Sequence, residues 1–243
     1  MSIVRTAKRL LSALGTLCFP PYCAECRVAT EPGVYLCDRC ASKALRIEAP
    51  FCERCSNPFD GAITQRFVCS NCAGREIHFE CAVALYRSFG VVRDFIHAFK
   101  YQRQLHLRRP LADWLAEALD DPRIAARPFD ALVPVPLHHL RFREREFNQA
   151  EELARLLSQR AGIPMWHALK RIRYTTTQTK LDRNERMENL RGAFKVRHNA
   201  EVKNRHIVLV DDVFTTGSTV EECSRVLLRA GAVSVRVVTV ARG

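Results

Sequence analysis

The sequence contains no long hydrophobic run. None of its apolar stretches approaches the roughly 18 residues that a transmembrane helix needs. Residues 10–19 are apolar and follow Arg5, Lys8 and Arg9, as in a secretory signal, but no small-x-small cleavage site comes after them. We therefore expect a cytoplasmic protein without stable membrane insertion. Its first residues are better interpreted as an amphipathic helix packed on the chain's own body, with transient membrane association as the alternative.

Acidic residues are scarce relative to basic ones. The 243 residues include 26 Asp and Glu against 38 Lys and Arg, a formal net charge of +12. This excess favours polyanionic partners such as nucleotides, pyrophosphate or nucleic acid, and charge alone does not choose among them. Residues 136–205 hold 16 basic and 8 acidic residues, so two thirds of the net charge lies there. The length accommodates one ordinary α/β domain plus something small.

Cysteine, in contrast, is abundant and regularly spaced. Eight of the 11 cysteines form four Cys-x2-Cys pairs: Cys23/Cys26, Cys37/Cys40, Cys52/Cys55 and Cys69/Cys72. Two such pairs supply four thiolates, a closed tetrahedral shell for structural Zn²⁺ that leaves no open position for catalysis. Consecutive pairing gives two zinc sites, as in a double zinc ribbon, and a crossed pairing stays open. Disulfides are disfavoured in a reducing cytosol, and each zinc site would contribute on the order of 10 kcal/mol to folding.

Apolar patterns after the cysteine-rich segment predict alternating strands and helices. We expect strands at 81–86, 131–135, 165–169 and 192–196, and helices at 91–99, 109–119 and 148–161. Two prolines in Val133-Pro134-Val135-Pro136 end their strand, and a stiff loop over 137–143 is expected to follow. His138 and His139 in that loop are more typical of solvated or helix-capping residues than of ligands. This alternation predicts an α/β fold.

The stretch 207–219 carries the strongest functional signal. Four apolar residues at 207–210 predict a central parallel strand covered on both faces, and Asp211 and Asp212 follow at its carboxyl end, where α/β folds bind ligands. A helix predicted over 220–230 is preceded by a small polar loop, whose backbone and hydroxyl groups suit a phosphate: Thr215, Thr216, Gly217, Ser218 and Thr219. Carboxylates would repel a phosphate but suit sugar hydroxyls and, indirectly, Mg²⁺. A phosphorylated ribose satisfies both halves of such a site. The alternative is a strand–turn–helix in which these residues only cap the helix.

This stretch resembles the phosphoribosyl pyrophosphate (PRPP) signature of type I phosphoribosyltransferases. The resemblance implies a parallel sheet flanked by helices, and PRPP bound as its Mg²⁺ complex. Asp211 and Asp212 are implied to hold the ribose hydroxyls and, through water, the metal. They are also implied to favour the positive charge that develops as pyrophosphate leaves. The loop 215–219 is implied to hold the 5-phosphate. No residue of the sequence stands out as a base.

Two basic segments match positions that such transferases use for the diphosphate. Arg141, Arg143 and Arg145 follow the strand that precedes the phosphate strand, and guanidinium groups match phosphate oxygens. The polar connection 170–191 is long for a compact domain and is typical of a lid. Lys180 and Arg183 in it would neutralise the leaving group. The alternatives are a solvated basic turn and a disordered or helical surface excursion.

Further motifs narrow the family. Pro134-Val135-Pro136, Phe147-Asn148-Gln149, the segment 173–178 and the segment 186–194, with the cysteine pairs, together resemble the ComF family, the competence protein F type. Glu146 stands where we expect Gly. The resemblance covers essentially the whole chain. Because the composition shifts near Cys81, we place the domain boundary there, with an N-terminal helix and double zinc ribbon over 1–80. A type I phosphoribosyltransferase-like domain is implied over 81–243.

The family resemblance implies a role in natural transformation or the use of imported DNA. Three functions are compatible with it: a transferase that acts on PRPP, a non-catalytic sensor of PRPP or a nucleotide, and a single-stranded DNA-binding protein. Proteins of the competence machinery are possible partners. Neither the acceptor substrate nor the oligomeric state can be read from the sequence.

Overall fold

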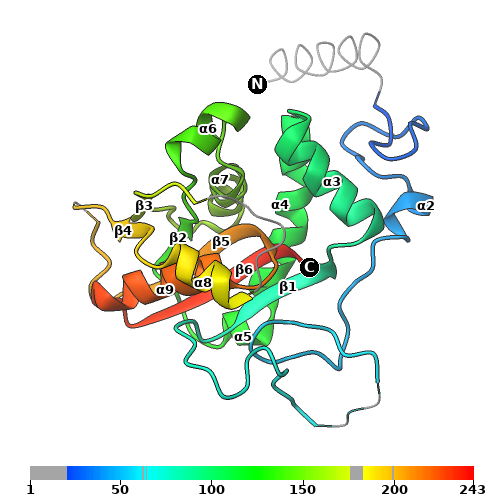
Figure 1. Ribbon diagram of the computed structural model, residues 1–243. Coiled ribbons are helices and arrows are strands. Elements are labelled where there is room, and N and C mark those ends of the chain that lie inside the picture. The colour runs from blue at the N-terminus through cyan, green and yellow to red at the C-terminus, as the bar shows by residue number, and fades with distance from the viewer. Residues whose placement is uncertain (1–20, 62, 64, 176–182, 199) are drawn as a thin grey trace.

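The computed structural model describes residues 21–61, 63, 65–175, 183–198 and 200–243 (Figure 1). Their centre is a four-stranded parallel sheet in the order β1-β6-β5-β2. Its strands are β1 (Ala82–Arg87), β2 (Ala131–Pro134), β5 (His206–Phe214) and β6 (Ser234–Arg242). β5 lies between β6 and β2, with Ile207 opposite both Ala131 and Val235. The prediction of a central parallel strand at 207–210 is therefore confirmed.

Helices cover both faces of this sheet (Figure 1). One face carries α3 (Gly90–Tyr101), α4 (Arg108–Glu117) and α7 (Gln149–Ala161), and the other carries α8 (Arg183–Leu190) and α9 (Ser218–Arg229). Side chains along a strand alternate between faces, and β5 shows this in its contacts. Val208 and Val210 belong to the core on the α4 and α7 side, whereas Ile207 and Leu209 belong to the core on the α9 side. The uninterrupted apolar run thus fills two cores at once.

The remaining elements are short. They are α2 (Asp38–Ala41), α5 (Pro122–Ala125), α6 (His139–Arg145), the antiparallel pair β3 (Leu169–Arg171) and β4 (Phe194–Val196), and two 3-10 turns, η1 (Leu105–Leu107) and η2 (Ala118–Asp120). Within the described residues, no helix has the length and apolar character needed to cross a membrane.

The prediction of a loop over 137–143 is wrong for most of that segment. Helix α6 begins directly after His138, whose Nδ1 accepts a hydrogen bond from the N–H of Leu140 at 3.4 Å. The two prolines end β2 as expected, but they do not prevent a helix from starting three residues later. The capping role expected for His138 is confirmed.

Two strand predictions also need correction. β5 does not end at Val210, because Asp211, Val213 and Phe214 continue the ladder with β6. The strand expected at 165–169 starts only at Leu169, and Met165 contributes a single bridge to Leu132. Backbone pairing with β6 extends β5 through Asp211 and Asp212, which an apolar pattern alone would not assign to a strand.

The cysteine-rich segment packs against the sheet. Cys52, Cys55, Cys72 and Phe79 share a core cluster with Ile207 and α9, and the backbone N–H of Ala82 donates to the carbonyl of Arg54 at 2.8 Å. The boundary between 80 and 81 stays a prediction, and the amphipathic N-terminal helix falls outside the described residues.

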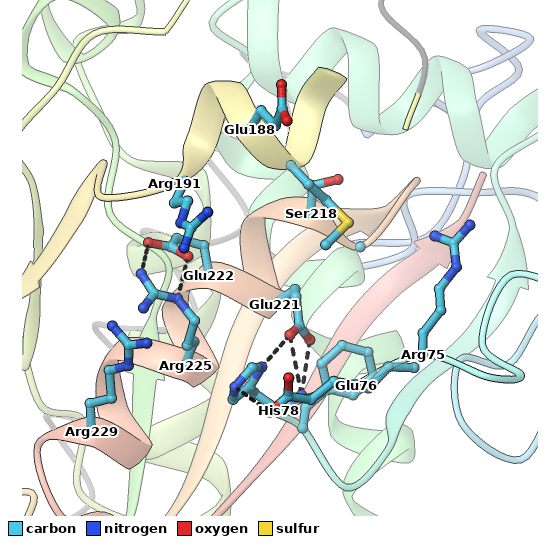
Figure 2. Close-up of a pocket in the computed structure, with 14 residues that line it drawn as sticks. Arg75, Glu76, His78, Glu188, Arg191, Ser218, Glu221, Glu222, Arg225 and Arg229 are labelled. Carbon is cyan, nitrogen blue, oxygen red and sulfur yellow. Dashed lines mark hydrogen bonds and ion pairs between the residues drawn. The ribbon is translucent and has the colours of Figure 1, made fainter. Parts of the chain in front are cut away.

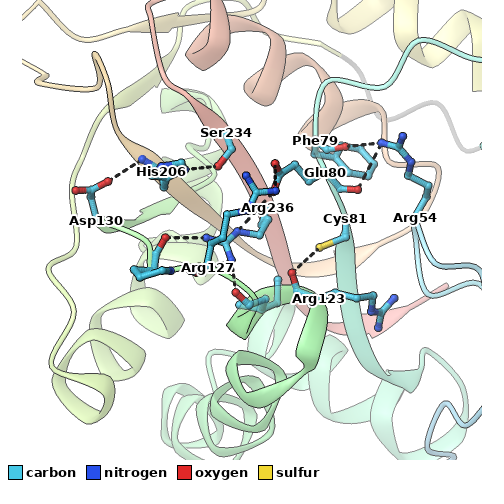
Figure 3. A network of polar contacts seen from close by, with 12 residues as sticks. Arg54, Phe79, Glu80, Cys81, Arg123, Arg127, Asp130, His206, Ser234 and Arg236 are labelled. Atoms are coloured by element: carbon cyan, nitrogen blue, oxygen red, sulfur yellow. Dashed lines mark hydrogen bonds and ion pairs between the residues drawn. The ribbon is translucent and has the colours of Figure 1, made fainter.

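A buried arginine secures the amino-terminal end of the sheet (Figure 3). Arg236 of β6 is 1% exposed, and its guanidinium donates to the carbonyls of Arg127 at 2.8 Å, Pro128 at 3.1 Å and Ile124. Glu80 Oε2 lies 4.0 Å from Nε and supplies a counter-charge. Burial lowers the pKa of Arg236, and the charge of Glu80 acts in the opposite direction. The residue ties the segment before β2 to the sheet.

Candidate functional site

The two acids of β5 lie at the carboxyl end of the sheet but have different surroundings. Strand alternation places Asp211 on the face of Ile207 and Leu209, and Asp212 on the opposite face. Asp212 is 7% exposed and its Oδ1 lies 2.7 Å from Nζ of Lys100, at the end of α3. Asp211 lines the small cavity formed by the polar loop. A ligand at this edge would therefore meet one carboxylate beside the loop and one held by a lysine.

Burial raises the pKa of Asp211 to about 7, and the nearby charge of Asp212 adds to the increase. Lys100, Arg145 and the N–H of Asp212, which donates to Asp211 Oδ1 at 2.9 Å, act in the opposite direction. Such a carboxyl is poised between its two protonation states near neutral pH. Carboxyl groups with a strongly shifted pKa are often found at functional sites.

The loop between β5 and α9 turns through a left-handed glycine. Gly217 caps α9 with φ of +78°, and a Cβ at this position would come within 2.5 Å of the Phe214 ring. The hydroxyls of Thr216 and Ser218 lie 2.9 Å apart, and both line a cavity of about 30 Å³. The N–H groups of the first turn of a helix have no partner within the helix, and Ser218, Thr219 and Val220 of this turn line the cavity. The volume suits a phosphate oxygen.

The three arginines of the predicted pyrophosphate segment lie on α6 and do not all share one face. Arg141 and Arg145 are four residues apart, so they project from the same side, whereas Arg143 projects elsewhere and is exposed. The guanidinium of Arg145 donates to the hydroxyl of Tyr101 at 2.9 Å and lies close enough to lower the pKa of Asp211. Arg145 is thus the member of the trio that the structure associates with the acids.

The predicted lid falls partly outside the described residues. Lys180 is outside them, and Arg183 is the first residue of α8. Glu146, where Gly was expected, adopts a left-handed conformation with φ of +69° at the end of α6, which explains why glycine suits the position. Its carboxylate accepts a hydrogen bond from Arg103 at 2.6 Å.

Sequence reasoning missed two basic residues at the site. Lys100 occurs in Phe99-Lys100-Tyr101, and its position just after a helical apolar pattern was the only available signal. Arg171, at the end of β3, lies in the electrostatic field of Asp211, and burial lowers its pKa. Nothing in the polar run around Arg171 distinguishes it from its exposed neighbours.

The eight cysteines form two compact clusters in consecutive pairing. Within each cluster all four sulfurs lie within 4.8 Å of one another: Cys23, Cys26, Cys37 and Cys40 in the first, Cys52, Cys55, Cys69 and Cys72 in the second. Tetrahedral Zn–S bonds of about 2.3 Å place sulfurs about 3.8 Å apart. The Cys26–Cys37 and Cys55–Cys69 separations are 3.6 Å and 3.7 Å, and all ten cysteines that the structure describes are free of disulfides.

Backbone N–H groups favour the thiolate form that binds metal at one cysteine of each cluster, Cys26 and Cys52. The N–H of Cys69 donates to the sulfur of Cys52 at 3.3 Å. The N–H of Val28 is the main cause that lowers the pKa of Cys26 to about 6. Both four-sulfur sets fit structural zinc ions. Cys223, expected to be a small buried hydrophobe, is fully buried in the core beside Ile207.

Comparison with known proteins agrees with this architecture. Residues 14–73 match the double zinc ribbon domain family, and residues 148–243 match the phosphoribosyl transferase domain family. The chain is 33% identical over 213 residues to competence protein F of Haemophilus influenzae, covering 85% of this chain and 90% of that protein. The chain belongs to the competence protein F family. The resemblance inferred from the motifs is confirmed.

Other relatives extend the family to further bacteria. DNA utilization protein YhgH of Escherichia coli K12 is 33% identical over 226 residues, 91% of this chain and 96% of YhgH. Competence protein ComFC of Bacillus subtilis is 26% identical over 207 residues, 83% of this chain and 81% of ComFC. These names connect the competence protein F family to competence and DNA utilization.

The chain is also similar, at lower sequence identity, to parts of solved structures. The B. subtilis glutamine PRPP amidotransferase, complexed with ADP and GMP, has a TM-score of 0.37 and 23% identity, over 54% of this chain and 25% of that chain. A purine phosphoribosyltransferase from Pyrococcus horikoshii has a TM-score of 0.35 and 18% identity, over 55% of this chain and 83% of that one.

Proposed function

We propose that this protein binds PRPP with Mg²⁺ at the carboxyl end of β5 and transfers its phosphoribosyl group, releasing pyrophosphate, in the use of imported DNA. The observation that carries the proposal is that three features lie around the same cavity. Asp211, the left-handed turn at Gly217 and the amino end of α9 border one small cavity. A capping role alone would not require an acid whose pKa burial has raised to about 7.

Different residues would bind different groups of PRPP. The N–H groups and hydroxyls of the loop 215–219 hold the 5-phosphate, and Asp211 accepts from the ribose hydroxyls beside it. Asp212 is the second acid of the site, and Lys100 keeps it oriented until ligand binds. Arg145 is the α6 arginine whose charge acts on the pKa of Asp211, and its guanidinium is suited to a diphosphate oxygen. Arg141, Arg143, Lys180 and Arg183 stay as further predicted contacts.

Mg²⁺ fits the oxygen-rich character of this edge and would neutralise the diphosphate charge when bound. The protein's own part is to orient the ribose and to place carboxylates near the anomeric carbon. These carboxylates favour positive charge as pyrophosphate leaves. The two zinc ions are structural, because all four positions of each cluster are filled by cysteine.

Retention of PRPP binding without transfer is the closest alternative. A sensor would bind PRPP with Mg²⁺ but release no pyrophosphate in the presence of any nucleobase. Pyrophosphate release with a panel of bases, measured beside calorimetric binding of PRPP, separates the two functions. Binding with release supports the transferase, and binding without release supports the sensor.

Single-stranded DNA binding is a second candidate function. The names of the relatives and the net charge of +12 favour it. The slope of log affinity against log salt for a single-stranded oligonucleotide reports how many phosphates the protein engages. A slope near zero would remove this function. Contacts with competence-machinery proteins are an extension of the same role.

A further inference from the structure

A second, larger cavity lies on the outer side of α9, next to the phosphate loop but separate from the acidic pair (Figure 2). Its volume is about 600 Å³, and its walls come from the segment 75–79 of the cysteine-rich region, from α8 and from α9. Gly217 and Ser218 at the start of α9 line both this cavity and the small one. Cavities of about 300–1,000 Å³ are typical of small-molecule sites. Neither Asp211 nor any α6 arginine lines it.

Three guanidinium groups lie along one side of this cavity. Arg225 and Arg229 are one turn apart on α9, and Arg191 follows α8 (Figure 2). Arg225 is bound to Glu222, with Nε to Oε2 at 2.7 Å. Within the described part of the chain, Arg191 and Arg229 form no ion pair with a carboxylate. Both are exposed, so their charges are available to an anion.

Four acids also line the cavity, Glu76, Glu188, Glu221 and Glu222, and the two on α9 already have hydrogen-bond donors. Glu222 accepts from the N–H of Gly192 at 2.7 Å as well as from Arg225. These bonds lower its pKa, although burial acts to raise it. Glu221 accepts from the N–H of His78 at 3.1 Å, and the Nδ1 of His78 lies 2.5 Å from its other oxygen. Glu221 and Glu222 are therefore held in place, while Arg191 and Arg229 form no ion pair with a carboxylate among the residues described.

An apolar surface completes the cavity. Ile77, Phe79 and Met187 contribute to its lining from two different segments. Inorganic phosphate would leave most of 600 Å³ unfilled, whereas a planar ring attached to a sugar phosphate would use both the apolar wall and the arginines. We propose that this cavity binds a nucleoside monophosphate, its phosphate on Arg191 and Arg229 and its base against Ile77 and Met187.

AMP is a suitable probe, but it is itself a phosphorylated ribose and could also enter the PRPP site. It is therefore titrated calorimetrically into the full-length, zinc-loaded double variant Asp211→Asn with Asp212→Asn as well as into the wild-type protein. We expect saturable binding of AMP and at least tenfold weaker binding of adenosine, which lacks the phosphate. Inorganic phosphate should also bind at least tenfold more weakly, since it lacks the ring. Equal affinity for AMP and adenosine, or no saturable AMP binding at millimolar concentration, would overturn the proposal.

Variants locate the site and separate it from the PRPP site. The double variant Arg191→Gln with Arg229→Gln should weaken AMP binding at least tenfold, and Arg93→Gln, an exposed arginine on α3, should leave it unchanged. The double variant Asp211→Asn with Asp212→Asn should keep AMP affinity within twofold. Loss of AMP binding in the aspartate variant would place the nucleotide at the PRPP site and contradict a separate cavity. Unchanged AMP affinity in the double arginine variant would also contradict the proposed site.

Discussion

The Nζ atom of Lys100 lies 2.7 Å from Oδ1 of Asp212, and this ion pair joins the end of α3 to the carboxyl-terminal part of β5. Both side chains are largely buried, with 17% and 9% of their surfaces exposed. Removal of one member of a buried pair leaves the other charge without compensation. The pair therefore links stability to the candidate site.

Lys100→Met should lower the free energy of unfolding by about 3 kcal/mol, because Asp212 then stays buried without a partner. Chemical denaturation at pH 7 measures this change. In the double variant with Asp212→Asn the loss should be at least about 1 kcal/mol smaller than the sum of the two single losses. Strict additivity would show that the two side chains do not interact.

The raised pKa of Asp211 predicts an unusual pH dependence. The folded value is about 7 and an unperturbed aspartate has about 3.9, so the folded state holds the proton more tightly. This tighter proton binding contributes to the free energy of unfolding. The contribution is fully present below pH 4 and is lost as the pH rises through 7. Asp211→Asn should therefore raise the free energy of unfolding at pH 8 by about 1 to 3 kcal/mol and have a much smaller effect at pH 4.

Asp212→Asn is the matched control, because this acid is paired with Lys100. We expect it to destabilise the protein at pH 8, the opposite sign to Asp211→Asn. Denaturant titrations at both pH values give the comparison. A stabilisation by Asp211→Asn that is equal at pH 4 and pH 8 would contradict the raised pKa of this carboxyl.

Gly217→Ala tests the conformation of the phosphate loop. The new Cβ would meet the Phe214 ring at 2.5 Å in a left-handed backbone, so we expect a loss of about 2 to 4 kcal/mol in stability. Gly162→Ala is the control. Its φ is +68°, but a Cβ added there would meet no atom within 4 Å, so about 1 kcal/mol of backbone strain is expected. Only Gly217→Ala should weaken PRPP binding, measured by calorimetry. Equal losses of stability and of PRPP affinity in the two variants would contradict a specific role for the conformation at Gly217.

The two cysteine clusters should differ in their importance for the fold. Metal analysis should find two zinc ions per chain, and one in Cys26→Ser or Cys55→Ser. Cys55 belongs to the same core cluster as Ile207, whereas Cys26 is only partly buried, so Cys55→Ser should destabilise the whole chain more. Cys81→Ser should keep two zinc ions, since Cys81 lies outside both clusters. Equal destabilisation by Cys26→Ser and Cys55→Ser would contradict this ranking.

Local patterns explain how much of the fold and of the site could be predicted from the sequence. β5, the loop and α9 are contiguous, and the two cysteine clusters use pairs spaced by two residues, so both could be recognised without the fold. Lys100 and Arg236 could not, because their partners are distant in sequence. Arg236 alternates with apolar neighbours as an outward-facing residue would, yet only the segment 124–128 supplies the carbonyls that let it be buried. The start of α6 was missed because a proline ends a strand without determining the conformation of the residues after it.

The central claim is that β5 and its loop form a PRPP site, and calorimetric titration of PRPP with Mg²⁺ tests it most directly. The wild-type protein should bind PRPP saturably. The double variant Asp211→Asn with Asp212→Asn, shown to be folded by its unfolding transition, should give no detectable binding. Unchanged PRPP affinity in that folded variant would contradict the account.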